Sequence, residues 1–276
     1  MFASSVDSVA SLRNLSIIFR DFMGLWRVCG LWVAARWLIA LPTCLRTVFR
    51  DRNLLAVDNC LGHGPFTVRL PTAQAPFRIC GTGAVSGIRE MYVRDGYLEG
   101  GLLAVRDGDF VVDLGANMGN FTNMALAHGP KVHVFAVEPG RRLNEIFKSS
   151  VSLNEGFLKR VTLISAFIGG MGEKQKITML SDEQYQDTIF MSEKDLLDEM
   201  KVCRIDLLKC DIEGGEFDLL HKNSKILTIT KSIAIEIHAF AGDVDLFICN
   251  LESSGFSVLS RKDAADGSSV VLATRL

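Results

Sequence analysis

Two short stretches of the sequence place acidic and basic side chains together at the ends of apolar runs. In IDLLKCDIEGGE, Lys209, Asp211 and Glu213 alternate with other residues, so a strand here would put all three on one face. In SIAIEIH, Glu236 and His238 alternate in the same way. Ligands of open parallel sheets bind at the carboxyl ends of the strands. Carboxylates and a histidine at such an edge are suited to proton transfer.

A third stretch, VVDLGANMGN, follows an apolar strand pattern with a glycine-containing turn. Its spacing, Asp113-x-Gly115-x-Asn117-x-Gly119, differs from the dinucleotide fingerprint, because residue 117 is not glycine and an acid precedes the first glycine. That acid would repel a pyrophosphate and attract an ammonium or a sulfonium group. Glu138 ends the next predicted strand, where a carboxylate can bind ribose hydroxyls. The pattern predicts a site for S-adenosylmethionine; the alternative is a turn used only for tight strand–helix packing.

These stretches, together with the VEP that ends at Pro139, resemble the FkbM family of S-adenosylmethionine-dependent methyltransferases. The resemblance covers roughly residues 107–260 and is most specific at IDLLKCDIEGGEFDLL. MSEKDLL, just upstream, departs from the family's usual TLDDL-like segment. The resemblance implies a class I methyltransferase fold: an α/β, Rossmann-like, doubly wound sheet of seven strands with the last one antiparallel.

The resemblance also implies which residues bind the cofactor. The turn would hold its amino acid end, Glu138 the ribose, and the end of the third strand the adenine. The implied set is Asp113, Gly115, Ala116, Asn117, Gly119, Glu138, Pro139, Ala166 and Phe167.

The activity that the resemblance implies is O-methylation of a hydroxyl on a sugar, natural-product or lipid-linked acceptor. An alcohol must lose its proton, so we expect a base beside the acceptor. His238 has the better ordinary pKa for a base near neutrality, whereas Asp211 is the better-matched family position, and both stay open. Glu213 and Lys209 would orient the base or the acceptor. We expect no resident metal; the alternative is Mg²⁺ held by Asp211, Glu213, Glu236 and His238.

Other function classes fit the sequence less well. An NAD-dependent oxidoreductase is disfavoured because residue 117 is not glycine. A nucleic-acid base methyltransferase would carry an aromatic, proline-containing motif where this chain has DIEGG, and a net charge of −2 indicates no nucleic-acid partner. The non-enzyme alternative is a catalytically silent domain that binds the cofactor and acts as a membrane or partner adaptor.

The elements that must position these residues alternate between strand and helix from residue 109 onward. The predicted strands are FVVDL, HVFAVEP, VTLISAFIG, IDLLKCDIE and SIAIEIHAF, followed by an antiparallel pair, FSVLSRK and SSVVLATRL. The predicted helices are NFTNMALAHG, RRLNEIFKSSVSLN, KDLLDEM, EFDLLHKNSKIL and DVDLFICNLESSG. This alternation predicts a doubly wound sheet with helices on both faces, and residues 107–276 as the cofactor-binding domain.

Residues 56–106 are expected to form a small strand and helix adaptor that packs on this domain. GPFTVRL and PFRIC read as a hairpin, and 84–98 as a short helix. The polar side chains offered there as contacts for the acceptor are His63, Arg69, Arg78, Arg89 and Tyr92.

Residues 1–55 read as an apolar helical arm that ends near Pro42 and the cluster Arg50-Asp51-Arg52. The first 52 residues carry seven arginines against three aspartates and no lysine. Arg27 and Arg36 interrupt the apolar run, so it is not a clean transmembrane helix, and it lacks the features of a secretory signal. Three interpretations stay open: a cap packed on the catalytic domain or on a second copy, a peripheral membrane helix, and a transit peptide.

The seven cysteines are scattered, with no Cys-x-x-Cys pair among the 276 residues. This usage predicts reduced, mostly buried thiols, and no disulfide framework or zinc site. We therefore expect a cytoplasmic protein, or a membrane-peripheral one if the arm binds a membrane. The expected partner is a small-molecule or glycan acceptor, and the sequence does not indicate an oligomeric state.

Overall fold

The computed structural model describes residues 3–169, 177, 180–186, 188–221 and 223–275. Its centre is a seven-stranded sheet in the order β10-β11-β9-β8-β3-β4-β5. The strands are β3 (Phe110–Leu114), β4 (His133–Val137), β5 (Val161–Ile164), β8 (Ile205–Cys210), β9 (Thr230–Ile237), β10 (Phe256–Asp263) and β11 (Ser269–Arg275). Strands β5, β4, β3, β8 and β9 pair in parallel, and β11 runs antiparallel to both β9 and β10. Seven strands with the last one antiparallel is the expected fold, which is confirmed.

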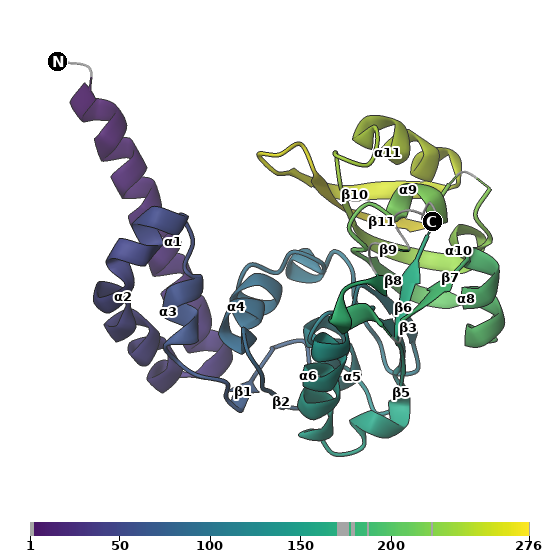
Figure 1. Cartoon of the computed structure of the whole chain (residues 1–276), viewed down its shortest axis with the longest axis horizontal. Helices are drawn as coiled ribbons and strands as arrows, with labels where there is room; N and C mark the ends of the chain where they lie inside the picture. Colours follow the sequence, from purple (N-terminus) through teal and green to yellow (C-terminus); the bar gives the residue numbers. More distant parts are fainter. Residues whose placement is uncertain (1–2, 170–176, 178–179, 187, 222, 276) are drawn as a thin grey trace.

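Helices cover both faces of this sheet (Figure 1). They are α5 (Asn120–Ala127), α6 (Arg141–Ser152), the short η3 (Phe157–Arg160), α8 (Glu193–Met200), α9 (Glu216–Leu219), α10 (Lys225–Ile229) and α11 (Val244–Ser253). The alternation of side chains explains why both faces are apolar. On β3, for example, Val111 belongs to one buried cluster and Val112 to the other.

Two of the elements predicted after residue 109 are divided in the structure. The apolar run after residue 160 does not form one strand. It forms β5 in the main sheet and then β6 (Ala166–Ile168), which pairs in parallel with β7 (Ile189–Met191) in a separate small sheet. The single helix expected at EFDLLHKNSKIL is instead α9 and α10, because Ser224 starts a new helix by accepting a hydrogen bond from Leu227 N.

Residues 56–106 supply the predicted hairpin and a run of short helices. The hairpin is β1 (Phe66–Val68) and β2 (Phe77–Ile79), paired antiparallel, which confirms that prediction. The helices are α4 (Ala84–Ile88), the π-helical turn η1 (Arg89–Val93) and η2 (Glu99–Gly101). The apolar residues of the arm and of this segment share one buried cluster with a face of the sheet. The division of the chain into three units stays a prediction.

The arm consists of α1 (Ala3–Cys29), α2 (Leu31–Asp51) and α3 (Leu55–Asn59). Gly30, with φ 92°, separates α1 from α2, and Arg52 in the left-handed region ends α2. Pro42 lies inside α2 and does not end it. In Figure 1 the arm stands on one side of the molecule, away from the sheet, and α1 extends beyond its neighbours. Among the described residues, α2 alone is long and apolar enough to cross a membrane, and 17% of its most apolar window is buried.

A closed cluster of charges holds the arm to the adaptor segment. The Arg89 guanidinium donates to Asp58 Oδ1 at 2.9 Å and Oδ2 at 2.7 Å, and to Asp21 Oδ2 at 2.6 Å. Asp58 Oδ1 also accepts from Trp37 Nε1 at 2.7 Å, and Asp21 accepts from Arg94 and Arg20. Both carboxylates are fully buried. Arg89 is therefore a structural anchor, and its expected contact with the acceptor is wrong.

The cysteines are all free, as expected. The expectation that most are buried is wrong. Cys29, Cys44 and Cys210 are buried, whereas Cys60, Cys203 and Cys249 are exposed and Cys80 is intermediate.

Candidate functional site

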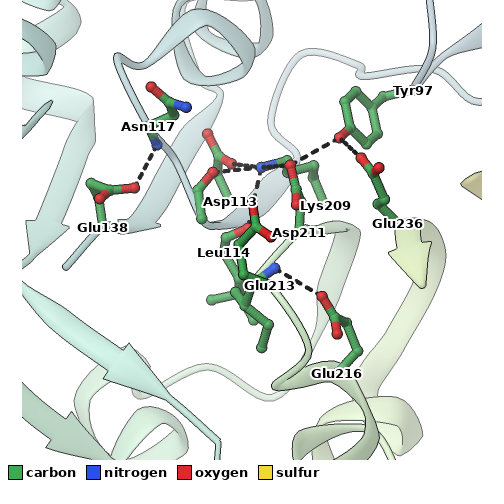
Figure 2. A network of polar contacts seen from close by, with 12 residues as sticks. Tyr97, Asp113, Leu114, Asn117, Glu138, Lys209, Asp211, Glu213, Glu216 and Glu236 are labelled. Carbon is green, nitrogen blue, oxygen red and sulfur yellow. Dashed lines mark hydrogen bonds and ion pairs between the residues drawn. The ribbon is translucent and has the colours of Figure 1, made fainter. Parts of the chain in front are cut away.

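The centre of the site is a buried ion pair across two parallel strands. Asp113 on β3 and Lys209 on β8 are register partners, and Lys209 Nζ lies 3.4 Å from Asp113 Oδ1. The same ammonium donates to the carbonyl oxygens of Leu114 at 3.2 Å and Gly115 at 2.6 Å. Burial lowers the pKa of Lys209, but the charges of Asp113 and Asp211 outweigh it, so this pKa lies above its ordinary value. Lys209 is therefore a fixed cation that also ties the glycine turn to β8 (Figure 2).

Two further carboxylates lie beside this pair and share one hydroxyl donor. Tyr97 donates to Asp211 Oδ2 at 3.2 Å and to Glu236 Oε2 at 3.3 Å, and its ring lies over Lys209 Nζ (Figure 2). Burial and the charge of Asp211 raise the pKa of Glu236. Burial and the same carboxylates raise the pKa of the Tyr97 hydroxyl, which stays a donor at neutral pH. Side chains from β3, β8, β9 and the adaptor segment therefore meet at this point.

His238 follows β9 and points its two ring nitrogens at carboxylates. Nδ1 lies 3.0 Å from Glu216 Oε1, and Nε2 lies 3.5 Å from Glu213 Oε2 and 4.0 Å from Asp211 Oδ1. The hydrogen bond to Glu216 outweighs burial and, with these charges, raises the pKa of His238 to about 9. The expectation of an ordinary pKa is wrong. At neutral pH the ring is an imidazolium, which cannot accept a proton until it has lost one.

The glycine turn is shaped by close contacts between strand ends. Gly115 has φ 73°, and a Cβ there would lie 1.7 Å from the carbonyl oxygen of Asp211. Gly119, with φ 79°, would place a Cβ 2.7 Å from the ring of Phe147, and it opens α5. Asn117 is in the left-handed region at φ 50°. The turn therefore brings the backbone after β3 against the backbone after β8. Asp113 is buried beneath the turn, where its Oδ2 accepts a hydrogen bond from Thr122 at 2.7 Å.

Glu138 directly follows β4 and faces the turn. Its Oε2 accepts from Asn117 N at 2.9 Å (Figure 2). Its Oε1 accepts from Gly140 N at 2.7 Å. Burial raises the pKa of Glu138 more than these two hydrogen bonds lower it. Pro139 next to it accepts a hydrogen bond from Thr188 Oγ1 at 2.7 Å through its carbonyl oxygen. The carboxylate is thus fixed beside the turn, where a ribose was expected.

Ala166 and Phe167 lie on β6, beyond the end of β5. Ala166 is buried. The Phe167 ring stacks on Phe190 with centroids 5.3 Å apart and an interplanar angle of 18°, and it meets Tyr185 of η4 (Glu183–Tyr185) at 5.0 Å. The charge of Glu138 contributes to the raised pKa of Tyr185, after burial. An apolar, aromatic wall therefore stands close to Glu138.

Negative charge exceeds positive charge at this edge of the sheet. Two cations, Lys209 and His238, lie among five carboxylates: Asp113, Asp211, Glu213, Glu216 and Glu236. Among the described residues, no donor hydrogen-bonds to the buried Asp113 Oδ1 or Glu216 Oε2. This excess of carboxylates is suited to a cationic ligand that carries an ammonium and a sulfonium. It also fits a divalent cation, because ligand atoms of Asp211, Glu213 and His238 lie within 4.8 Å of one another.

The structure brings together most of the residues expected from the sequence and adds others. Tyr97, Thr122 and the buried Glu216 were not expected at the site. Glu216 belongs to the IDLLKCDIEGGE stretch, and its carboxylate accepts a hydrogen bond from Ile212 N, four residues earlier. This short spacing is the feature of the sequence that could have indicated Glu216. Of the polar contacts expected in residues 56–106, Tyr92 is buried and donates to Asn120 O. His63, Arg69 and Arg78 are exposed, and no contact joins them to this site among the described residues.

Comparison with known families and sequences gives one domain match and one distant relative. The model described as "Methyltransferase FkbM domain" matches residues 113–258. The AMB antimetabolite synthetase AmbE of Pseudomonas aeruginosa strain PAO1 is 24% identical over 266 residues, and the match covers 78% of this chain. The matched part is 12% of that synthetase, so the chain spans a small fraction of its relative.

Solved structures with a similar fold are distant in sequence. Fibrillarin of Aeropyrum pernix with natively bound S-adenosyl-L-methionine is 14% identical, with a TM-score of 0.44 over 66% of this chain and 74% of that one. The precorrin-6y C5,15-methyltransferase of Geobacter metallireducens is 13% identical, with a TM-score of 0.40 over 63% of this chain and 84% of that one. The fold assignment rests on the strand order and the domain match.

Proposed function

We propose that this chain, which belongs to the FkbM methyltransferase family, transfers a methyl group from S-adenosylmethionine to a hydroxyl oxygen of a sugar, natural-product or lipid-linked acceptor. The family membership rests on a domain match over residues 113–258. The observation that carries the proposal is the surplus of carboxylates over cations at the carboxyl edge of the sheet, where the buried Asp113 and the part-exposed Asp211 both lie beside Lys209. This surplus is suited to a cationic cofactor, and the family uses one.

Different residues along the carboxyl edge of the sheet would bind different parts of the cofactor. Asp113 and the turn that ends at Gly119 would hold the amino acid end, and Glu138 would accept hydrogen bonds from the ribose hydroxyls. Phe167, in its aromatic wall with Tyr185, would pack against the adenine. Lys209 keeps the turn in place by donating to Gly115 O. The bound cofactor supplies an activated methyl group on a sulfonium, so positioning of the acceptor does most of the catalysis.

The acceptor hydroxyl must lose its proton as its oxygen forms the new bond to carbon. His238 is already protonated near neutral pH, so it is poorly suited to receive that proton. We assign Asp211 as the base, because its side chain is 28% exposed and so open to an acceptor, while Lys209 and Tyr97 hold it in place. His238 and Lys209 then hold the carboxylate in place through charge. A base of this kind adds about 10²–10⁴-fold to the rate.

The first test is calorimetric titration of the full chain with S-adenosylmethionine. Asp113→Asn and Glu138→Gln are each expected to weaken binding by about 10- to 100-fold, because each removes a charged hydrogen-bond partner. Glu145→Gln is the matched control, since its carboxylate on α6 is 69% exposed. Circular dichroism of each variant checks that it is folded. Tight binding by both site variants, or no binding by the folded wild type, would remove the proposal.

A second measurement distinguishes a metal-dependent reaction from a metal-independent one. Turnover of the wild type on an accepted hydroxyl compound is compared with and without a strong chelator. We expect no change, because Lys209 and His238 already supply positive charge beside Asp211. Loss of turnover that Mg²⁺ restores would instead assign Asp211, Glu213 and His238 as metal ligands.

A further inference from the structure

The arm exposes an unusual amount of apolar surface. Nine of the seventeen exposed large apolar side chains among the described residues lie in the arm. Trp32, Ile39 and Phe49 are the most exposed of these, at 75%, 73% and 73%. The arm face is defined here as these nine residues: Phe19, Trp26, Leu31, Trp32, Leu38, Ile39, Leu45, Phe49 and Leu55. A cluster of this size on the surface indicates a binding partner.

On α2 these residues form one continuous stripe. Leu31, Leu38 and Leu45 repeat every seven positions, with Phe49 on the same side, and Trp32 and Ile39 widen this surface on the flank that also carries the arginines. The opposite side of α2 carries Ala34, Trp37 and Cys44, which are buried against the rest of the arm. Helix α2 is therefore apolar on two sides, one packed inside the protein and one facing out.

Arginines line the stripe, and no acidic residue interrupts it. Arg36, Arg46 and Arg50 are exposed along one edge of α2, next to Trp32 and Ile39 by helical spacing. On α1, Arg20 and Arg27 are each one residue from the exposed Phe19 and Trp26. The sequence has no aspartate or glutamate between Asp21 and Asp51. The arm face thus combines apolar and positive groups.

This combination selects among the three kinds of partner that an apolar helix face can have. A second copy of the chain would bring arginine edges of like charge together, which opposes a symmetric contact. A membrane-spanning helix would need lipid on all sides, but Trp37 is fully buried and its indole donates to Asp58. A helix that lies in the plane of a membrane needs one apolar side, aromatic residues near the headgroups and basic residues toward anionic lipids.

We propose that the arm face binds the surface of an anionic lipid bilayer. Phe49, Ile39 and Trp32 enter the boundary between headgroups and acyl chains, and Arg36 and Arg46 contact lipid phosphates and carboxylates, whereas Arg50 is already paired with Asp51. Each arginine near such a surface strengthens binding about fivefold, and the attraction falls with salt. The inference is independent of methyl transfer, because it depends on no residue of the candidate site.

The chain carries its own fluorescent reporter for the test. All three tryptophans, Trp26, Trp32 and Trp37, lie in the arm. Trp26 and Trp32 are exposed, so their emission is expected to shift to shorter wavelength when the full-length protein meets vesicles of phosphatidylcholine with phosphatidylserine. Vesicles of phosphatidylcholine alone should give a much smaller shift. Vesicle co-sedimentation gives the affinity without relying on tryptophan.

Three variants separate apolar insertion from charge. Trp32→Ser, Ile39→Ser and Phe49→Ser combined are expected to lower vesicle affinity at least about 100-fold, since each removes a large side chain from the lipid boundary. Arg36→Gln with Arg46→Gln should lower it about 25-fold on anionic vesicles only. The matched control combines Leu158→Ser, Ile189→Ser and Leu246→Ser, which are 54%, 54% and 60% exposed outside the arm and should leave affinity unchanged.

Three results would overturn the proposal. Equal affinity for neutral and anionic vesicles would show that the arginines do not recognise lipid charge. Equal loss in the control variant would show that the arm face is not the site. Absence of vesicle binding, together with self-association in sedimentation that the arm triple variant abolishes, would assign the face to contact between copies.

Discussion

The cluster that joins the arm to the adaptor segment, called here the arm cluster, and the candidate site each bury a cation among carboxylates. The cation is Arg89 in the arm cluster and Lys209 at the site. Around Arg89, all four oxygens of Asp21 and Asp58 accept hydrogen bonds from arginine or tryptophan side chains. Burial raises the pKa of Asp21, but the hydrogen bonds and charges of Arg94 and Arg89 outweigh it, so the net shift is downward. Its charge is stabilised by the fold alone.

The cluster around Lys209 is not balanced in this way. Asp113 Oδ1 is buried without a hydrogen bond among the described residues, although Lys209 Nζ is 3.4 Å away. The pKa of Glu236 is raised, which means that its charged form is unfavourable where it lies. In a structural cluster the charged groups are paired with one another, whereas a ligand site has charged groups that a ligand pairs with. The two regions therefore respond differently to the same kind of substitution.

The largest effect is expected from opening the arm cluster. Asp58→Ala removes the partner of Arg89 and Trp37 in a fully buried site, and should lower the free energy of unfolding by about 3–5 kcal/mol. Denaturant unfolding measures this. Asp51→Ala, which breaks the exposed pair with Arg50, is the control and should cost about 0–1 kcal/mol.

The same Asp58 variant should not change the affinity of the folded protein for S-adenosylmethionine, measured at low denaturant. A normal stability with weakened cofactor binding would reverse the roles that we assign to the two clusters.

The second effect depends on pH, because the site contains a titratable cation and the arm cluster does not. The pKa of His238 is raised from 6.5 to about 9 in the folded protein. A raised pKa stabilises the fold fully below pH 6.5, and this contribution is lost as pH rises through about 9. We expect the difference in unfolding free energy between wild type and His238→Gln to shrink by about 2–3 kcal/mol from pH 6 to pH 10.

The measurement is made in the presence of a chelator, so that no metal competes for the imidazole. Glu216→Gln should bring the pKa of His238 back toward its ordinary value, which nuclear magnetic resonance titration of the ring reports. A constant difference across this pH range would show that His238 is not held as an imidazolium.

The sequence was sufficient to predict the parts of the site that local patterns carry. Period-two alternation predicted that Lys209 and Asp211 point to one side, although β8 ends at Cys210 and Asp211 lies just beyond it. Lys209 pairs in register with Asp113 on the neighbouring parallel strand. The sequence did not reveal Tyr97, which lies 114 residues before Asp211 and comes from a segment outside the sheet. Tyr97 lies in the turn between η1 and η2, and a single tyrosine in a turn gives no local signal that its hydroxyl will reach a strand end.

Two other differences also come from tertiary structure that overrides local pattern. The apolar run after residue 160 has no internal break signal, yet Ser165 separates β5 from β6 because Ile189 N bonds to its carbonyl and β7 pairs with β6. The pKa of His238 could not be read from the sequence, because it depends on Glu216, which folds back from α9. In contrast, the start of α10 has a local signal in the sequence, because Ser224 is a capping residue.

The third effect has the opposite sign to the first. Glu236→Gln removes a charge that burial and Asp211 make unfavourable, so it should raise the free energy of unfolding at pH 7 by about 0.5–1.5 kcal/mol. The gain should vanish below about pH 4.5, where wild-type Glu236 is protonated in both states. Glu252→Gln on the exposed side of α11 is the control, with little change expected. Destabilisation by Glu236→Gln would mean that this site is balanced like the arm cluster.

The last comparison is between two buried tyrosines whose hydroxyls contact different groups. Tyr97 donates to the carboxylates of Asp211 and Glu236, whereas Tyr92 donates to the backbone carbonyl of Asn120 at 2.6 Å. Replacement of either by Phe should cost about 0.5–1.5 kcal/mol of stability, the usual value of one hydrogen bond. Tyr97→Phe should also lower the turnover number, because Asp211 loses the group that orients it, while Tyr92→Phe should leave turnover unchanged. Equal turnover in the two variants would place Tyr97 with the packing residues of the adaptor, and the Asp211–Glu236 pair would then have to be oriented by Lys209 and His238 alone.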